Sequence, residues 1–195
     1  MLAAAAPAVA APTILVVGDS LSAAHGMAVE AGWVARLRQR LDERGYPHRV
    51  VNASVGGDTT SGGRARLPEA LAEHQPAIVI IELGGNDGLR GQSLQAMRAN
   101  LAAMVERSRQ AGARVLLLGV RLPPNYGPAY SEAFAAIYRQ VADSHEAVLV
   151  PRLLEGVGER REFMQADGIH PNADGHARIL DNVWPALKDF LPQAT

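Results

Sequence analysis

The stretch Thr13-Ile14-Leu15-Val16-Val17-Gly18-Asp19-Ser20 decides the fold of this chain. The β-branched, apolar run 13–17 predicts a buried strand, and Gly18-Asp19-Ser20 predicts a sharp turn at its carboxyl end. In open α/β sheets, ligands bind at that end of the strands. A serine on such a turn presents its hydroxyl to a crevice beside backbone N–H groups, as a nucleophile requires. The plainer explanation is that Asp19 and Ser20 only cap a helix, and this stretch alone does not choose between the two.

Apolar runs and helical periodicity alternate along the rest of the chain. This alternation predicts an α/β fold with a parallel sheet covered on both faces and joined by right-handed crossovers. No repeat or break in composition divides residues 13–195, so we expect a single domain there. Pro185 should kink or end the last helix, and 122–128 should be a stiff, irregular loop. The further strands are predicted at 49–53, 77–83, 114–120 and 147–150, and the helices at 33–44, 64–73, 93–111, 130–143 and from about 172 onward.

Composition excludes several classes of function. The chain has 195 residues, a formal net charge of -1 and no cysteine. Without cysteine there is no disulfide, thiolate metal site or cysteine nucleophile, and without a basic stripe we expect no nucleic-acid partner. Residues 1–12 are Ala-rich, are interrupted by prolines and contain the A-x-A pattern Ala8-Val9-Ala10. We interpret them as the remnant of an export signal, or else a disordered leader, and expect no stable membrane insertion.

Small, polar, glycine-containing segments follow three successive predicted strands, at Gly18–Ser20, Gly56–Asp58 and Gly84–Asp87. Because the carboxyl ends of parallel strands meet at one edge of a sheet, the three segments should lie together. A structural loop has no need to be small and polar at three strand ends. The coincidence therefore favours an active site over helix capping at Ser20.

A serine nucleophile needs a base, and the base needs an acceptor that orients it. His170 lies three residues after Asp167 in a loop bounded by glycine and proline. That spacing lets Asp167 accept from one ring nitrogen while the other faces Ser20. His25 has no carboxylate nearby in sequence. Three other histidines precede predicted strands at the wrong edge of the sheet, namely His48, His74 and His145.

With these residues in place, the chain resembles the SGNH hydrolases, also called the GDSL family. Ser20, Gly57, Asn86 and His170 match the four residues that name the family. The segments 82–91 and 121–127 resemble its periplasmic thioesterase I / lysophospholipase L1 (arylesterase) branch. One departure is His25, where a glycine-aromatic pair is expected. The matching blocks are Gly18-Asp19-Ser20-Leu21-Ser22, Asn52-Ala53-Ser54-Val55-Gly56-Gly57-Asp58-Thr59, Gly84-Gly85-Asn86-Asp87 and Asp167-Gly168-Ile169-His170-Pro171.

The resemblance implies a three-layer, flavodoxin-like sandwich with five parallel strands in the order 2-1-3-4-5. It implies a serine hydrolase that cleaves ester and thioester bonds of acyl-CoA, lysophospholipid or aryl ester substrates, with no cofactor and no metal. Ser20 would form the acyl-enzyme, and His170 and Asp167 would complete the triad. The oxyanion would be held by the backbone N–H groups of Ser20 and Gly57 and by the amide of Asn86. We expect a periplasmic or secreted monomer.

The segment after the fourth predicted strand is apolar and stiff. Leu122, Pro123 and Tyr126, together with Leu89, are candidates for the wall of an acyl pocket. The same residues could equally be loop packing. An apolar wall favours fatty acyl substrates over the polar, open cleft expected of a carbohydrate O-deacetylase of the same superfamily, which is the alternative enzyme.

Two further alternatives come from other classes of protein. Asp167, His170, Asp174 and His176 are all possible metal ligands, but a metal site would leave Ser20 unexplained. A non-catalytic module that binds phosphate at the turn 18–22 would give no role to the pair of Asp167 and His170.

Overall fold

Strand β1 (Thr13–Gly18) lies inside a five-stranded parallel sheet in the computed structural model, which describes residues 11–192. The strand order is β2-β1-β3-β4-β5, as predicted. Each β1 residue from Ile14 to Val17 is fully buried, because β2 and β3 flank the strand and helices cover both faces. The other strands are β2 (Arg49–Asn52), β3 (Ile78–Glu82), β4 (Arg114–Leu118) and β5 (Val148–Val150).

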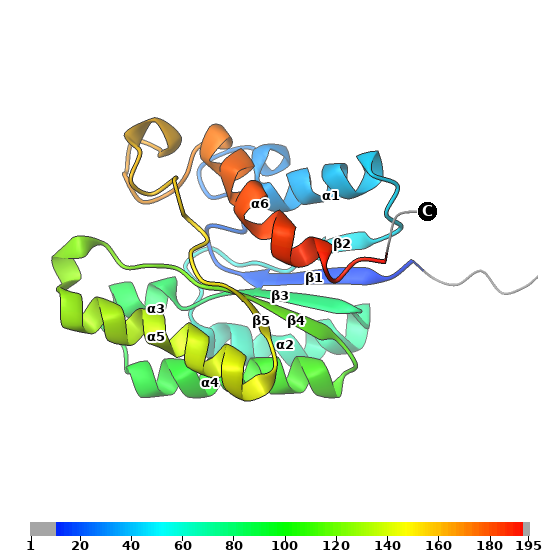
Figure 1. The fold of residues 1–195 in the computed structure, drawn as a ribbon, viewed down its shortest axis with the longest axis horizontal. Helices are drawn as coiled ribbons and strands as arrows, with labels where there is room; N and C mark the ends of the chain where they lie inside the picture. Colours follow the sequence, from blue (N-terminus) through cyan, green and yellow to red (C-terminus); the bar gives the residue numbers. More distant parts are fainter. Residues whose placement is uncertain (1–10, 193–195) are drawn as a thin grey trace, which may run out of the picture.

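Two layers of helices enclose the sheet (Figure 1). Helices α1 (Trp33–Glu43) and α6 (Ala173–Lys188) cover one face. The other face is covered by α2 (Thr60–His74), α4 (Leu94–Gln110) and α5 (Pro128–His145), beside the short α3 (Gly85–Leu89). The predicted three-layer fold is therefore confirmed. Single 3₁₀ turns lie at Val29–Ala31, Pro124–Tyr126 and Arg161–Phe163.

The structure differs from the predicted elements mainly beside the carboxyl edge of the sheet. Helix α2 begins at Thr60, within a segment predicted to be a loop, because the Thr59 side chain accepts a hydrogen bond from the Gly62 N–H and caps the helix. Gly63 is required for packing, since a Cβ there would lie 2.2 Å from Leu83 Cδ1. The glycine-containing segment after β3, for which no helix was predicted, forms the one-turn helix α3.

Three proline positions also differ from expectation. Helix α5 begins at Pro128, which needs no N–H in the first turn of a helix. The predicted irregular loop contains the 3₁₀ turn Pro124–Tyr126. Helix α6 continues through Pro185 to Lys188. Pro185 deprives the carbonyl of Asp181 of a partner, but both residues are exposed, so water can satisfy that carbonyl.

The export-signal interpretation falls mostly outside the described residues, since 1–10 are not described. Residues 193–195 lie outside them as well. Within 11–192, no helix combines the length and the apolar character needed to cross a bilayer.

The buried His176 of α6 makes stability depend on pH. Its Nδ1 accepts a hydrogen bond of 3.1 Å from the backbone N–H of Trp33, the first residue of α1, and its side chain is almost inaccessible. Burial, with smaller effects from Arg36 and His170, lowers the pKa of His176 from 6.5 to about 4. The neutral imidazole therefore stabilises the fold above pH 6.5, and this contribution is lost as pH falls toward 4.

We expect the free energy of unfolding to fall by up to about 3 kcal/mol from this group alone between those pH values. His176→Asn keeps an acceptor near the Nδ1 position but does not titrate, so its stability should depend less on pH over the same range. Urea unfolding at several pH values measures this for both proteins. Parallel stability curves for the two proteins would show that His176 does not carry the effect.

Candidate active site

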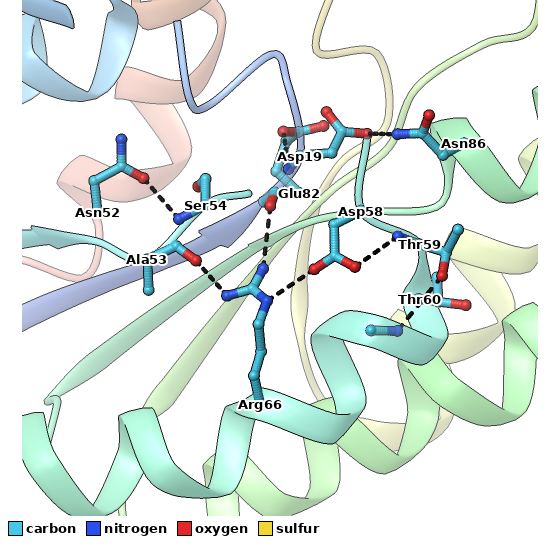
Figure 2. A network of polar contacts seen from close by, with 12 residues as sticks. Asp19, Asn52, Ala53, Ser54, Asp58, Thr59, Thr60, Arg66, Glu82 and Asn86 are labelled. Atoms are coloured by element: carbon cyan, nitrogen blue, oxygen red, sulfur yellow. Dashed lines mark hydrogen bonds and ion pairs between the residues drawn. The ribbon is translucent and has the colours of Figure 1, made fainter. Parts of the chain in front are cut away.

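The carboxyl edge of the sheet is held together by Arg66 of α2 (Figure 2). Its guanidinium donates to the carbonyl of Gly18 at 3.2 Å, to the carbonyl of Ala53 and to Asp58 Oδ2 at 2.8 Å. These acceptors lie at the end of β1, just after β2 and in the following loop. One side chain therefore fixes two strand ends and the segment that carries Gly57.

Ser20, His170 and Asp167 form a continuous chain of hydrogen bonds. Ser20 Oγ lies 3.0 Å from His170 Nε2, and His170 Nδ1 lies 2.6 Å from Asp167 Oδ2. The other carboxylate oxygen of Asp167 accepts from the backbone N–H groups of Ile169 and His170. Ser20 and His170 are 150 positions apart in the chain, and the fold brings them together. The three side chains are bonded in the order that a nucleophile, its base and an orienting acid require.

Asp167 is partly exposed and remains ionised at neutral pH. The hydrogen bond with the His170 ring and the backbone N–H groups of His170 and Ile169 hold the pKa of its carboxyl well below its usual range. A permanent negative charge beside Nδ1 favours the tautomer with the proton on Nδ1, so Nε2 can accept a proton from Ser20.

Ser20 lies on an isolated helical turn rather than at the start of a regular helix. The turn is closed by bonds from Ala23 N–H to the Asp19 carbonyl and from His25 N–H to the Ser20 carbonyl. The next α-helix begins only at Trp33. Asp19 accepts from the Leu21 N–H, so the capping explanation is locally correct for Asp19, while Ser20 Oγ is bonded to His170.

Asn86 and Gly57 face the same edge and are tied to each other by Arg90. Asn86 Nδ2 donates to Asp19 Oδ2 at 2.9 Å, and Asn86 Oδ1 lies 3.4 Å from Arg90 Nη2. The same Arg90 nitrogen donates to the Gly57 carbonyl at 2.9 Å. Glycine is needed at 57 because φ is +75°, a left-handed conformation that other residues rarely adopt.

A second link joins these loops below the surface. The carboxylate of buried Asp87 accepts from the backbone N–H and the hydroxyl of Thr60, the first residue of α2. A negative charge at a helix N-terminus is favourable, so this contact anchors α2 to the segment after β3. The two loops that carry Gly57 and Asn86 therefore hold a defined relative position.

His25 packs directly on the candidate base. Its ring centroid lies 4.5 Å from that of His170, and its carbonyl accepts from Gln165 Nε2 at 2.8 Å. The departure from the family pattern thus places a second imidazole on one side of His170.

The four candidates for an acyl-pocket wall have different surroundings. Leu122 is 8% exposed and packs in the core, where a Cβ on Gly88 would lie 2.7 Å from its Cδ2. The Tyr126 hydroxyl donates to the Leu89 carbonyl, which fixes the loop after β4 to α3. Leu89 and Pro123 are exposed. The packing of Leu122 fits the loop-packing explanation, and a pocket lined by the others stays a prediction.

The proposed metal ligands do not gather. Asp167 and His170 bond to each other, whereas His176 is buried against the first residue of α1. Within 11–192, no three His, Asp or Glu side chains are arranged to hold a metal ion.

Several residues that shape this edge were not singled out from the sequence. They are Arg66, Arg90, Asp87 and Glu82. The available signal was Glu82, a carboxyl inside the otherwise apolar run 77–83, which we expected to be buried. A charged residue in such a run is unusual and indicates a polar partner.

A serine bonded to a His–Asp pair, at the carboxyl edge of a three-layer parallel sheet, is the arrangement of a serine hydrolase. The model of the GDSL-like Lipase/Acylhydrolase family matches residues 16–178, and the chain belongs to that family.

Its relatives have similar lengths. The chain is 58% identical over 182 residues to Esterase TesA of Pseudomonas aeruginosa, covering 93% of this chain and 90% of the relative. It is 45% identical to Thioesterase 1/protease 1/lysophospholipase L1 of Escherichia coli, covering 92% and 84%. Among solved structures, TesA matches with a TM-score of 0.91 and 57% identity, over 92% of this chain and 99% of that one. The psychrotrophic esterase EstA from Pseudoalteromonas sp., inhibited by monoethylphosphonate, matches with a TM-score of 0.87 and 38% identity, over 91% and 97%.

The geometry of Asn86 generates a prediction for catalysis. Asn86→Ala removes an uncharged N–H donor, and we expect kcat to fall by roughly 10²–10³, about 2.7–4 kcal/mol, with KM nearly unchanged. Asn86→Asp should be at least as damaging, because a carboxylate would repel both the oxyanion and Asp19. Steady-state kinetics and melting temperatures of both variants are the measurement. If the alanine variant loses several degrees in Tm while kcat falls less than about tenfold, Asn86 only holds its turn.

Proposed function

We propose that this chain hydrolyses carboxylic ester and thioester bonds of acyl substrates through an acyl-enzyme on Ser20. The observation that carries the proposal is the hydrogen-bonded chain from Ser20 Oγ to His170 and Asp167. Membership of the GDSL-like Lipase/Acylhydrolase family and the esterase and thioesterase names of the relatives support the reaction class.

The first half of the reaction forms the acyl-enzyme. Ser20 Oγ bonds to the acyl carbonyl carbon while His170 Nε2 takes the hydroxyl proton. The tetrahedral intermediate then breaks its bond to the leaving oxygen or sulfur, which receives that proton from His170. In the second half, water attacks the acyl carbon and His170 takes a proton from it. The bond from that carbon to Ser20 Oγ then breaks, Ser20 Oγ receives the proton from His170, and the carboxylic acid leaves. Asp167 stays ionised throughout and stabilises the imidazolium.

The negative oxygen of each tetrahedral intermediate needs donors aimed at it. Asn86 Nδ2 carries two hydrogens, one of which is bonded to Asp19. The second hydrogen, with the backbone N–H groups of Ser20 and Gly57, forms the proposed oxyanion hole. Arg90 supports this assignment, because it donates to Asn86 Oδ1 and so identifies which end of the amide is the oxygen. The NH₂ group of Asn86 then faces the site.

Apolar side chains on the loops around the site support an acyl substrate. Four of the five large hydrophobic residues exposed within 11–192 lie on strand-to-helix connections, which emerge at the carboxyl edge of the sheet. They are Val29, Val55, Leu89 and Ile169. An apolar rim suits a fatty acyl chain better than a carbohydrate. The acetyl xylan esterase of known structure, at 19% identity, shares the fold and adds no support for the O-deacetylase alternative.

The proposal extends to location and assembly. A periplasmic or secreted location is supported by the A-x-A pattern at 8–10 and by the resemblance to a periplasmic branch of the family, and we propose that the chain is a monomer. Cell fractionation of the full chain and size-exclusion chromatography test these two points.

Covalent labelling tests the nucleophile. A fluorophosphonate should add to Ser20 alone, because the hydroxyl that His170 deprotonates attacks the phosphorus as it attacks an acyl carbon. Peptide mass mapping locates the adduct, and hydrolysis of p-nitrophenyl esters measures the accompanying loss of activity. Ser22→Ala is a poor control because Ser22 is buried and bonded to Glu82. The control is therefore Ser144→Ala, at an exposed position in the last turn of α5. An adduct on another residue, or full activity in Ser20→Ala, contradicts the proposal.

Chain-length preference tests the apolar rim. Leu89→Ala should lower kcat/KM for long-chain esters and thioesters more than for acetyl esters, by about 1–3 kcal/mol at most. Val148→Ala is the matched control, because Val148 is similarly exposed but begins β5 at the opposite edge. Equal losses at all chain lengths, or higher activity on acetylated xylan than on acyl substrates in the wild type, would argue against a fatty acyl substrate.

A further inference from the structure

Two carboxyl groups are buried next to each other directly beneath the candidate nucleophile. Glu82 is the last residue of β3 and pairs in register with Gly18, the last residue of β1. Glu82 is 1% exposed, and Asp19, which follows Gly18, is 3% exposed. Figure 2 shows both side chains at the end of the sheet, with Asn86 on the far side of Asp19.

The pair lacks a neutralising cation. Within 11–192, neither Asp19 nor Glu82 forms an ion pair. Arg66, which bonds the carbonyl of Gly18 beside the pair, is engaged by that carbonyl, by the Ala53 carbonyl and by Asp58. Two adjacent buried carboxylates without a cation are strongly unfavourable, so one of the two must hold a proton.

The titratable groups that surround the pair do not supply this charge. The Tyr138 hydroxyl of α5 donates to the Leu83 carbonyl, and burial raises its pKa well above the usual range, so it stays neutral. Asp87 of α3 is bonded to Thr60. His170 bonds Ser20 and Asp167 and neither buried carboxyl, and its charge lowers the pKa of Asp19 less than any other contribution does.

Hydrogen bonding decides which of the two carboxyls is neutral. Both oxygens of Asp19 accept from N–H donors, Oδ1 from Leu21 at 3.0 Å and Oδ2 from Asn86 at 2.9 Å, which is the pattern of a carboxylate. Glu82 Oε2 accepts from the Ser22 hydroxyl at 2.7 Å and from the Asp19 N–H at 3.3 Å. Glu82 Oε1 has no donor directed at it, which leaves it as the oxygen that carries a proton.

The pKa shifts of the two groups agree with this assignment. Burial, and then the negative charge of Asp19, raises the pKa of Glu82 well above its usual range. Burial also raises the pKa of Asp19, but the hydrogen bonds with Leu21, with the Glu82 side chain and with Asn86 oppose that effect.

We propose that Glu82 is a positioning residue that stays protonated in the working enzyme, so that the single charge of the pair remains on Asp19 and orients the amide of Asn86. The neutral Glu82 also holds Ser22 and the Asp19 backbone, which flank the nucleophile on its turn. This inference rests on the proposed function, because it assigns Asn86 to the oxyanion hole. Glu82 itself touches no substrate.

Infrared spectroscopy tests the protonation state without reference to activity. At neutral pH, the wild type should show the carbonyl stretch of a protonated carboxylic acid, which a carboxylate lacks. Glu82→Gln should abolish this band, and the control Glu106→Gln, at an exposed position on α4, should retain it. A wild type without the band, or a band that survives in Glu82→Gln, overturns the proposal.

A double-mutant cycle tests whether Glu82 acts through Asn86. Glu82→Leu should lower kcat by about tenfold or more with little change in KM, since a misdirected oxyanion donor affects mainly the transition state. The conservative Glu82→Gln, neutral and able to accept from Ser22, should restore most of that loss. In the Asn86→Ala background, Glu82→Leu should cost less than about threefold, because no amide remains to be oriented.

An equal loss in both backgrounds would show that Glu82 does not act through Asn86. If Glu82→Leu fails to fold, Asp19→Asn takes its place in the same cycle, with the same expected and contrary results. Fluorophosphonate labelling of each variant separates this inference from the proposed function. An unlabelled Ser20 in the wild type contradicts the hydrolase itself, whereas a labelled Ser20 with no coupling to Asn86 contradicts only the role of Glu82.

Discussion

The parallel pairing of β1 with β2 and β3 is the constraint on which the rest of the structure depends. Parallel strands direct all their carboxyl ends to one edge, and there the segments after β1, β2 and β3 supply Ser20, Gly57 and Asn86. Close packing of β1 on both faces opposes register slippage, since a shift of one residue would place every side chain among the neighbours of the other face. In this register the last residue of β1, Gly18, pairs with Glu82. This pairing fixes the position of Ser20, two residues further on, relative to the end of the sheet.

The polar groups at this edge are satisfied mainly by one another, because the core below them is closed to water. Arg66 donates to carbonyls at the end of β1 and just after β2. Asp87 accepts hydrogen bonds from the first residue of α2. An unsatisfied buried polar group costs roughly 1–3 kcal/mol, so such a network has few alternative arrangements. Rigidity of this kind is what an oxyanion hole requires, since its donors must already be in place when charge develops.

The three acids of the site have different environments and therefore different roles. Asp167 is partly exposed and bonded by three N–H donors, which keeps it charged beside His170. Asp19 is buried yet bonded by two donors, whereas Glu82 is buried with one oxygen unpartnered. Asp167 and Asp19 thus carry a negative charge, and each lies beside a donor that it orients, His170 or Asn86. Glu82 carries no charge in our proposal. In the mechanism that we propose, the same residue chemistry gives a base-orienting acid, an amide-orienting acid and a neutral support.

The sequence by itself determined the fold class, the strand order through the family resemblance, and the residues brought together around Ser20. It could do so because apolar strands, glycine-rich turns and the short spacing of Asp167 and His170 are local signals. Only the tertiary structure decided the helical state of 60–63 and 85–89, because Thr59, Asp87 and the packing against Leu83 outweigh the low helix propensity of glycine. It also decided the partners of Glu82, Arg66 and Arg90. Those contacts join residues far apart in the chain, and no local pattern encodes which side chain a buried carboxyl or guanidinium will meet.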